Sequence, residues 1–190
     1  MEAFNTYLQQ FPHYQVTSFR KALPYLSRMT LQEGQHFLEY GKISKNIAFV
    51  EKGLLRLYHL NDGREITNCF CAENTITTAY RSLTSQTASE IGIQAIEYSE
   101  LIVLPYDALL RLYEKDLFWQ QLERLAVEKE YFIAEDRHQF LNDLDATERY
   151  LQVLNDHPDL LQRVPLNYLA SYLQIVPETL SRIRKKISRT

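Results

Sequence analysis

The residues with the clearest potential for chemistry lie near the C-terminal end of the chain, in a stretch that begins at Pro177. Four polar residues there, Glu178, Ser181, Arg182 and Lys185, are spaced i, i+3, i+4 and i+7. On an α-helix this spacing puts all four on one face. Arginine can bond guanine O6 and N7, glutamate can accept from cytosine N4, and serine can pair with several bases. The pattern predicts a helix face that reads base edges in double-stranded DNA.

Two short helices joined by a tight turn are expected to carry this face. Apolar residues recur at helical spacing from Leu166 to Leu173, and Pro177 suits the first turn of a second helix, where its missing N–H costs nothing. Five of the last nine residues are basic and none is acidic, which suits contact with phosphates. The predicted DNA-binding residues are Glu178, Thr179, Ser181, Arg182, Lys185, Lys186 and Arg189.

From periodicity alone, a surface helical hairpin with a solvated basic face explains this stretch equally well. The run Leu-Ala-Ser-Tyr-Leu at 169–173, followed by Pro-Glu-Thr-Leu-Ser-Arg-Ile at 177–183, resembles the helix-turn-helix of the CRP/FNR superfamily, bacterial regulators related to the cyclic-AMP receptor protein. In that family a Glu-x-x-Ser-Arg motif reads the half-site, and the matching residues here are Glu178, Ser181 and Arg182. The resemblance therefore favours the DNA-reading interpretation.

Two positions depart from the pattern of that family. Gln174 stands where the turn usually carries a glycine. Val176 occupies the cap position that favours Ser or Thr, which costs the second helix about 1 kcal/mol of stability.

Composition and charge set the broad class of the protein. A chain of 190 residues with 45% hydrophobic and 12% aromatic residues can bury one core and form two modest domains. The net charge is −3, yet residues 147–190 hold seven Lys/Arg against four Asp/Glu, which makes the predicted DNA-binding end the basic end. There is no apolar run near 18 residues and no signal-peptide pattern, so we expect a cytoplasmic protein without a membrane partner.

Short β-rich runs separated by turn residues extend from about residue 25 to 105, which favours a sandwich or barrel. The Asp-Gly pair at 62–63 predicts a hairpin, because these residues readily adopt positive φ. This part resembles the β-roll of the superfamily, a jelly roll of the cyclic-nucleotide-binding type, through Phe-Val-x-x-Gly-x-x-Arg-x-Tyr at 49–58 and Asp-Gly-Arg-Glu at 62–65.

Residues 116–143 contain no Gly or Pro and predict one long helix. Its heptad-spaced apolar residues give a predicted dimer interface of Phe118, Leu122, Leu125 and Phe132. Packing of this stripe on the β-roll of the same chain is the alternative. The corresponding helix is the dimer interface in the superfamily, so the resemblance favours pairing.

The resemblance argues against cyclic AMP as the effector. Family members that bind it hold the cyclic phosphate with an Arg beside a Ser or Thr, and the ribose with a Glu after a Gly. The matching residues here are 77–79 and 87–89, in which a serine persists but neither the Arg nor the Gly-Glu pair does. Arg81 is near enough in sequence to substitute for the missing Arg, so the candidate ligand pocket is Thr78, Arg81 and Ser89. No cofactor is predicted, and the identity of a small-molecule effector is left open.

An enzyme and a metal site are not expected. The five histidines are scattered, and no His-Glu-x-x-His, phosphate loop, Gly-x-Ser-x-Gly or dinucleotide fingerprint occurs. Cys69 and Cys71 are two residues apart, so on a strand their side chains share one face. Half-buried strand residues are the favoured interpretation, and a redox-sensing pair is the alternative.

These patterns together predict an α+β fold with a cyclic-nucleotide-binding-like β-roll at residues 1–115, a long dimerisation helix at 116–144 and a helix-turn-helix domain at 145–190. The predicted function is a homodimeric, DNA-binding transcription regulator of CRP/FNR type that reads a palindromic site, with RNA polymerase as a further candidate partner. The alternative is a ligand-sensing or protein-interaction module of the same fold that does not bind DNA.

Overall fold

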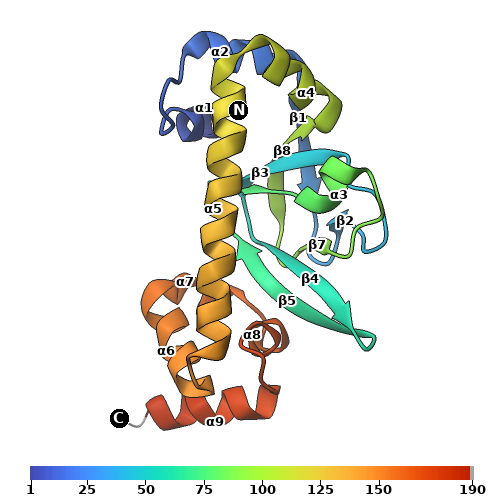
Figure 1. Cartoon of the computed structure of the whole chain (residues 1–190). Coiled ribbons are helices and arrows are strands. Elements are labelled where there is room, and N and C mark those ends of the chain that lie inside the picture. Colours follow the sequence, from blue (N-terminus) through green and yellow to red (C-terminus); the bar gives the residue numbers. More distant parts are fainter. Residues whose placement is uncertain (189–190) are drawn as a thin grey trace.

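The computed structural model describes residues 1–188, so Arg189 of the predicted DNA-binding set lies outside the described residues. One long helix, α5 (Leu117–Asn142), runs the length of the molecule. The β-sheets lie beside its middle, the N-terminal helices surround its first turns, and the C-terminal helices surround its last turns (Figure 1).

The β-part consists of two four-stranded antiparallel sheets, with strand orders β1-β8-β3-β6 and β2-β7-β4-β5. The predicted β-roll is thereby confirmed, and its core between the sheets is apolar. The strands are β1 (Ser27–Leu31), β2 (His36–Leu38), β3 (Asn46–Lys52), β4 (Leu55–Asn61), β5 (Arg64–Cys71), β6 (Ile76–Thr77), β7 (Gly92–Ala95) and β8 (Ser99–Pro105).

The β4–β5 hairpin forms at the predicted turn, where Asp62 and Gly63 have φ values of 50° and 74°. Alternation along β4 sends Leu55 and Leu57 into the core of the roll. Arg56 consequently faces away from this core, toward the C-terminal helices. Strand β5 is the last strand of its sheet, so one of its edges is not paired with another strand.

The remaining helices cap the two ends of the molecule. Helices α1 and α4 and the first turns of α5 form a second core with one face of the β3–β8 sheet. No helix within residues 1–188 is long and apolar enough to cross a membrane. The helices other than α5 are α1 (Glu2–Leu8), α2 (Val16–Ala22), a 3₁₀ turn (Leu23–Tyr25), α3 (Tyr80–Ser85), α4 (Tyr106–Lys115), α6 (Ala146–Asp156), α7 (Pro158–Arg163), α8 (Leu166–Tyr172) and α9 (Pro177–Ile187).

The predicted long helix is confirmed, but the predicted interface on it needs correction. Phe118 and Leu122 are only 3% and 7% exposed, because the N-terminal helices and the sheet cover the first turns of α5. Leu125 is half-buried, and Phe132 alone of the four predicted residues is fully on the surface. A heptad stripe shows that a face is apolar without showing which surface covers it, and here the start of the stripe packs within its own chain.

Candidate functional site

The polar face predicted near the C-terminal end lies on α9. The chain leaves α8 through Gln174, whose φ of 53° provides the left-handed turn residue without a glycine, and Pro177 then opens α9. Val176 is the N-cap of α9 and makes no side-chain cap hydrogen bond. Leu180 and Ile183 bury the opposite face of α9 in the C-terminal core. The helix therefore has one anchored face and one free face.

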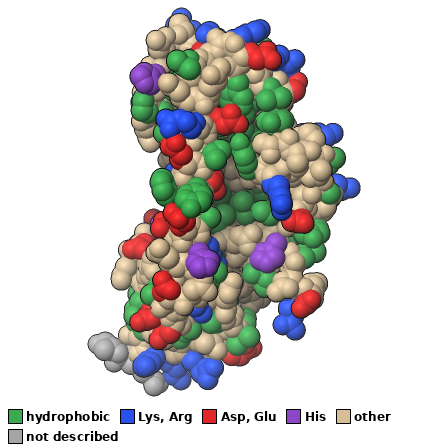
Figure 2. Space-filling model, in the orientation of Figure 1, with side chains coloured by type: hydrophobic (Ala, Val, Ile, Leu, Met, Phe, Trp, Pro, Cys, Tyr) green, Lys and Arg blue, Asp and Glu red, His purple; other side chains and the backbone are tan. Residues whose placement is uncertain are grey.

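The structure brings the six described members of the predicted DNA-binding set together on this free face. Thr179 is half-buried and accepts a hydrogen bond from Arg182 Nη2 at 3.0 Å. The other described members are exposed, namely Glu178, Ser181, Arg182, Lys185 and Lys186. Lys and Arg side chains gather on the surface at this end of the molecule (Figure 2). Arg184 points inward instead, toward the ring of Tyr150, and is half-buried.

Helix α8 covers the free edge of β5. The backbone N–H of Thr67 donates to Ser171 Oγ at 2.9 Å, and this hydroxyl donates to the carbonyl of Glu65 at 3.2 Å. The rings of Phe70 and Tyr172 pack with centroids 5.3 Å apart. These contacts satisfy an exposed strand edge and fix the helix before α9 against the β-roll.

Arg56 joins the same two parts from the face of the sheet. It is 1% exposed, and its guanidinium lies 3.7 Å from the ring centre of Tyr168 on α8 and 4.6 Å from that of Tyr58. Nε donates to Gln94 Oε1 at 2.9 Å, and Nη2 pairs with Glu65. A buried arginine held by stacking and charge requires these partners to stay in place.

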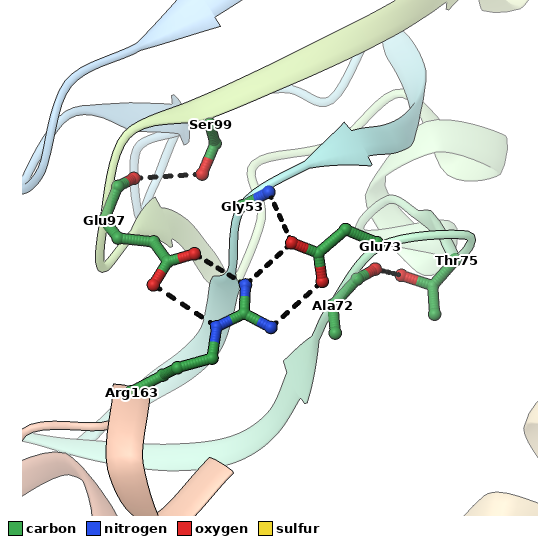
Figure 3. Close-up of polar contacts among 7 residues, drawn as sticks. All are labelled: Gly53, Ala72, Glu73, Thr75, Glu97, Ser99 and Arg163. Atoms are coloured by element: carbon green, nitrogen blue, oxygen red, sulfur yellow. Dashed lines mark hydrogen bonds and ion pairs between the residues drawn. The ribbon is translucent and has the colours of Figure 1, made fainter. Parts of the chain in front are cut away.

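A second arginine, Arg163 at the end of α7, forms ion pairs with two carboxylates of the β-roll (Figure 3). Nη1 and Nη2 donate to Glu73 at 3.0 and 2.8 Å, and Nη2 and Nε donate to Glu97 at 2.6 and 3.3 Å. The N–H of Gly53 also donates to Glu73 Oε1 at 2.8 Å. Glu97 and Glu73 are 66 and 90 positions from Arg163 in the sequence, so no local pattern predicted the cluster.

The charges of this cluster reinforce one another. Partial burial by itself would raise the pKa of Glu73, but hydrogen bonds from Arg163 and from backbone N–H groups outweigh it and hold the pKa below its usual range. Hydrogen bonds to Glu97 and Glu73 raise the pKa of Arg163. Glu73 and Arg163 are therefore both charged at neutral pH, and their pairing is weakened when acid protonates Glu73.

The candidate ligand residues do not converge in the roll. The Thr78 hydroxyl donates to the carbonyl of Asn46 at 3.0 Å, and the Ser89 hydroxyl donates to the carbonyl of Ile91 at 2.8 Å. The Arg81 side chain is 91% exposed and lies 3.7 Å from Glu90. The two hydroxyls thus stabilise loops, and the one cation of the candidate pocket faces solvent.

A groove of about 620 Å³ separates β5 from the last turns of α5 and from α6. Cys69, Arg137 and Tyr172 lie on its wall, among other residues. Hydrogen bonding with Cys71 and burial raise the pKa of Cys69, and the same hydrogen bonding lowers the pKa of Cys71. Both thiols are free and half-buried, and within residues 1–188 no three His, Cys, Asp or Glu residues group together as metal ligands.

Comparison with known proteins agrees with this architecture. Residues 28–116 match the family described as Cyclic nucleotide-binding domain. Solved structures also match the chain over most of its length. No curated protein sequence matches the chain.

Three of these solved structures cover most of the chain. FixK2 from Bradyrhizobium japonicum superposes with a TM-score of 0.72 at 17% identity, over 86% of this chain and 85% of that one. CLP, the c-di-GMP responsive global regulator of Xanthomonas campestris, gives 0.72 at 18% over 92% of each chain. A putative transcriptional regulator of the crp/fnr family from Eubacterium rectale gives 0.74 at 15%, over 95% of this chain and 88% of that one. The likeness shows a shared fold.

Replacing Arg163 should loosen the C-terminal helices. We expect Arg163→Met to lower the free energy of unfolding by about 1–2 kcal/mol, because it leaves two carboxylates unpaired although all three groups are partly solvated. Chemical denaturation measures the change. The matched control is Arg28→Met, which removes an exposed arginine with one ion-pair contact at 3.5 Å and should cost about 0.3 kcal/mol.

The pH dependence of the stability provides a second test of the same cluster. The lowered pKa of Glu73 contributes stability above its unfolded pKa of about 4.3, and this contribution is lost as the pH falls through the lower folded pKa. Between about pH 5 and pH 3, Arg163→Met should therefore lose less stability than the wild type. Equal losses in the two proteins would show that Arg163 does not stabilise the charged carboxylate.

Proposed function

We propose that the protein is a dimeric transcription regulator in which α8 and α9 act as a helix-turn-helix and α9 enters the major groove of DNA. The observation that carries this proposal is the free face of α9, which presents Glu178, Ser181 and Arg182 together while its opposite face is buried. A recognition helix needs this division, because one face must be held by the protein while the other meets base edges.

The surroundings of α9 support contact with a polyanion. Lys185 and Lys186 lie in its last turn, beside the residues proposed to read bases, and can contact phosphates. Arg184 does not belong to this surface because it faces Tyr150. The crp/fnr regulator of Eubacterium rectale, which shares this fold, is itself described as a putative transcriptional regulator.

The middle of α5 supports a dimer. Val127 and Tyr131 are 41% and 61% exposed, although they are large and apolar. Exposed apolar residues clustered on one helix mark a surface that another chain covers. A heptad series runs along this exposed stretch at alternating spacings of four and three, through Gln120, Arg124, Val127, Tyr131, Ala134 and His138. We propose this series as the interface, in place of the stripe that begins at Phe118.

Such a dimer would place two copies of α9 on the same side of the molecule. A palindromic site presents its half-sites about 34 Å apart, one helical turn of DNA. Helices α7 and α8, which precede α9, are held to the roll of their own chain by Arg163 and Arg56, so the distance between the two copies of α9 depends mainly on how the two α5 helices pair.

We also propose that the roll does not bind cyclic AMP through the candidate pocket. A buried phosphate needs a cationic partner to offset its loss of hydration. The Arg81 side chain is directed to solvent. The hydroxyls of Thr78 and Ser89 already donate hydrogen bonds to nearby backbone carbonyls.

The proposed base-reading role can be tested on a site that the chain selects from random duplex DNA. Arg182→Ala should weaken binding to this site by about 1–3 kcal/mol and reduce discrimination, whereas Lys185→Ala should weaken all sequences about equally. Fluorescence anisotropy across a salt series measures both. Arg20→Ala, an exposed arginine on α2 at the opposite end of the molecule, is the control and should change nothing. Equal effects of Arg182→Ala on selected and random DNA would contradict base reading.

The interface can be tested by sedimentation at micromolar concentration. Tyr131→Glu should dissociate the dimer, because it would bury two like charges at the centre of the proposed seam. Phe132→Glu, an adjacent residue with almost the same exposure, lies outside that seam and should leave the dimer largely intact. The reverse result would restore the interface predicted from the sequence, and a monomeric wild type would refute the dimer.

Calorimetric titration tests the absence of cyclic nucleotide binding. Cyclic AMP and cyclic GMP should show no binding tighter than about 100 μM, or about −5.5 kcal/mol. Micromolar binding that Arg81→Ala abolishes would show that Arg81 turns inward to hold the phosphate.

A further inference from the structure

The Cys69 and Cys71 thiols form a pair with an unusual setting. Both lie on β5, two residues apart, and hydrogen bonding between the thiols raises the pKa of Cys69 and lowers that of Cys71. Cys71 packs against the core of the roll, while Cys69 lines the groove beside α5 and is reached from solvent. One cysteine of the pair therefore contacts the core of the roll, and the other contacts the groove.

The strand geometry decides which chemistry such a pair can perform. Residues i and i+2 of a strand are about 6.5 Å apart at Cα, with parallel side chains. A disulfide needs Cβ atoms about 3.5–4.5 Å apart, so the strand would have to distort to form one. Two metal–thiolate bonds of about 2.3 Å each span roughly 4.6 Å between the sulfurs, which parallel side chains reach without distortion.

The Thr77 hydroxyl provides an independent observation. Thr77 is 4% exposed, and its Oγ1 has no geometrically sound hydrogen-bond partner among the described residues. It nevertheless lies beside the Cys71 sulfur. A buried hydroxyl without an acceptor is costly, and a metal-bound thiolate is an acceptor that satisfies it.

We propose that Cys69 and Cys71 bind one soft, thiophilic monovalent metal ion, of which Cu(I) is the typical example, between their two sulfurs. On binding, each thiol releases its proton to solvent and forms a metal–sulfur bond. Thiolates select such ions over harder ones. Tetrahedral ions such as Zn²⁺ need four ligands, and no third ligand of the His, Cys, Asp or Glu type joins the pair within residues 1–188.

Glu130 and Arg137, both on α5, act on Cys69 in opposite directions, because the carboxylate opposes a negative charge there and the guanidinium favours it. Two thiolates and a monovalent ion carry one net negative charge. Arg137 acts electrostatically on Cys69 from the wall of the groove, and its buried Nη1 has no hydrogen-bond partner in the described part of the chain. The guanidinium therefore supplies the opposite charge, and its Nη2 donates at 2.6 Å to the carbonyl of Tyr172 on α8. Metal binding is in this way connected to the helix before α9.

The test is a titration of the reduced full-length chain with Cu(I) in competition with a chromophoric chelator. We expect one Cu(I) per chain, lost in both Cys69→Ser and Cys71→Ser. X-ray absorption on the loaded wild type should show two sulfur ligands, a readout that needs no variant. Thr77→Val should weaken affinity about 10-fold or more, as loss of a hydrogen bond to a metal ligand does.

Thr67→Val is the matched control, because Thr67 is a buried threonine on β5, the strand of the two cysteines, and is not among the groups that shift the pKa of either thiol. It should leave the Cu(I) affinity unchanged. Failure of the wild type to compete for Cu(I), retention of the ion by either serine variant, or one ion per two chains would overturn the proposal. A loss of two mass units on treatment with peroxide, without Cu(I) binding, would overturn it in favour of a disulfide pair.

Discussion

The free edge of β5 is the constraint on which the arrangement of this protein depends. An unpaired strand edge exposes N–H and C=O groups that must be satisfied or protected. Here α8 performs this task through Ser171, which both accepts from Thr67 and donates to Glu65. Because α9 follows α8 after a four-residue turn, covering the edge also determines where the polar face of α9 lies.

Two arginines make this docking specific. Arg56 contributes stacking against Tyr168 in a site with almost no solvent, whereas Arg163 contributes charge in a site that is still partly hydrated. Stacking and desolvated contacts demand exact placement, and partly hydrated ion pairs tolerate small shifts.

Gly53 belongs to the same network as Arg163 and Glu73. Its φ is 98°, and a Cβ there would come within 2.3 Å of Ser99 Oγ, so only glycine lets its N–H reach Glu73.

Local patterns predicted the elements well and their mutual contacts poorly. The Asp-Gly hairpin, the long helix and the Pro177 helix start depend on neighbouring residues, and all three formed as expected. The start of α6 is also local, because Asp145 forms a capping box with Glu148 three residues later. The burial of Phe118, the outward position of Arg81 and the Arg163 cluster depend on segments distant in the sequence, which periodicity does not report. The face of α9 was predictable because one helix contains it entirely.

Helix α5 is anchored at both ends, with Trp119 in the core beneath the N-terminal helices and Phe140 in the core of the C-terminal helices. Between these anchors it is an unbroken helix, and each residue adds about 1.5 Å and 100° of rotation. The number of residues between Trp119 and Phe140 therefore determines both the distance between the two ends of α5 and the rotation of one end relative to the other. One inserted residue would turn α8 by more than a quarter of a circle away from the edge of β5, so this segment can change in sequence but not in count.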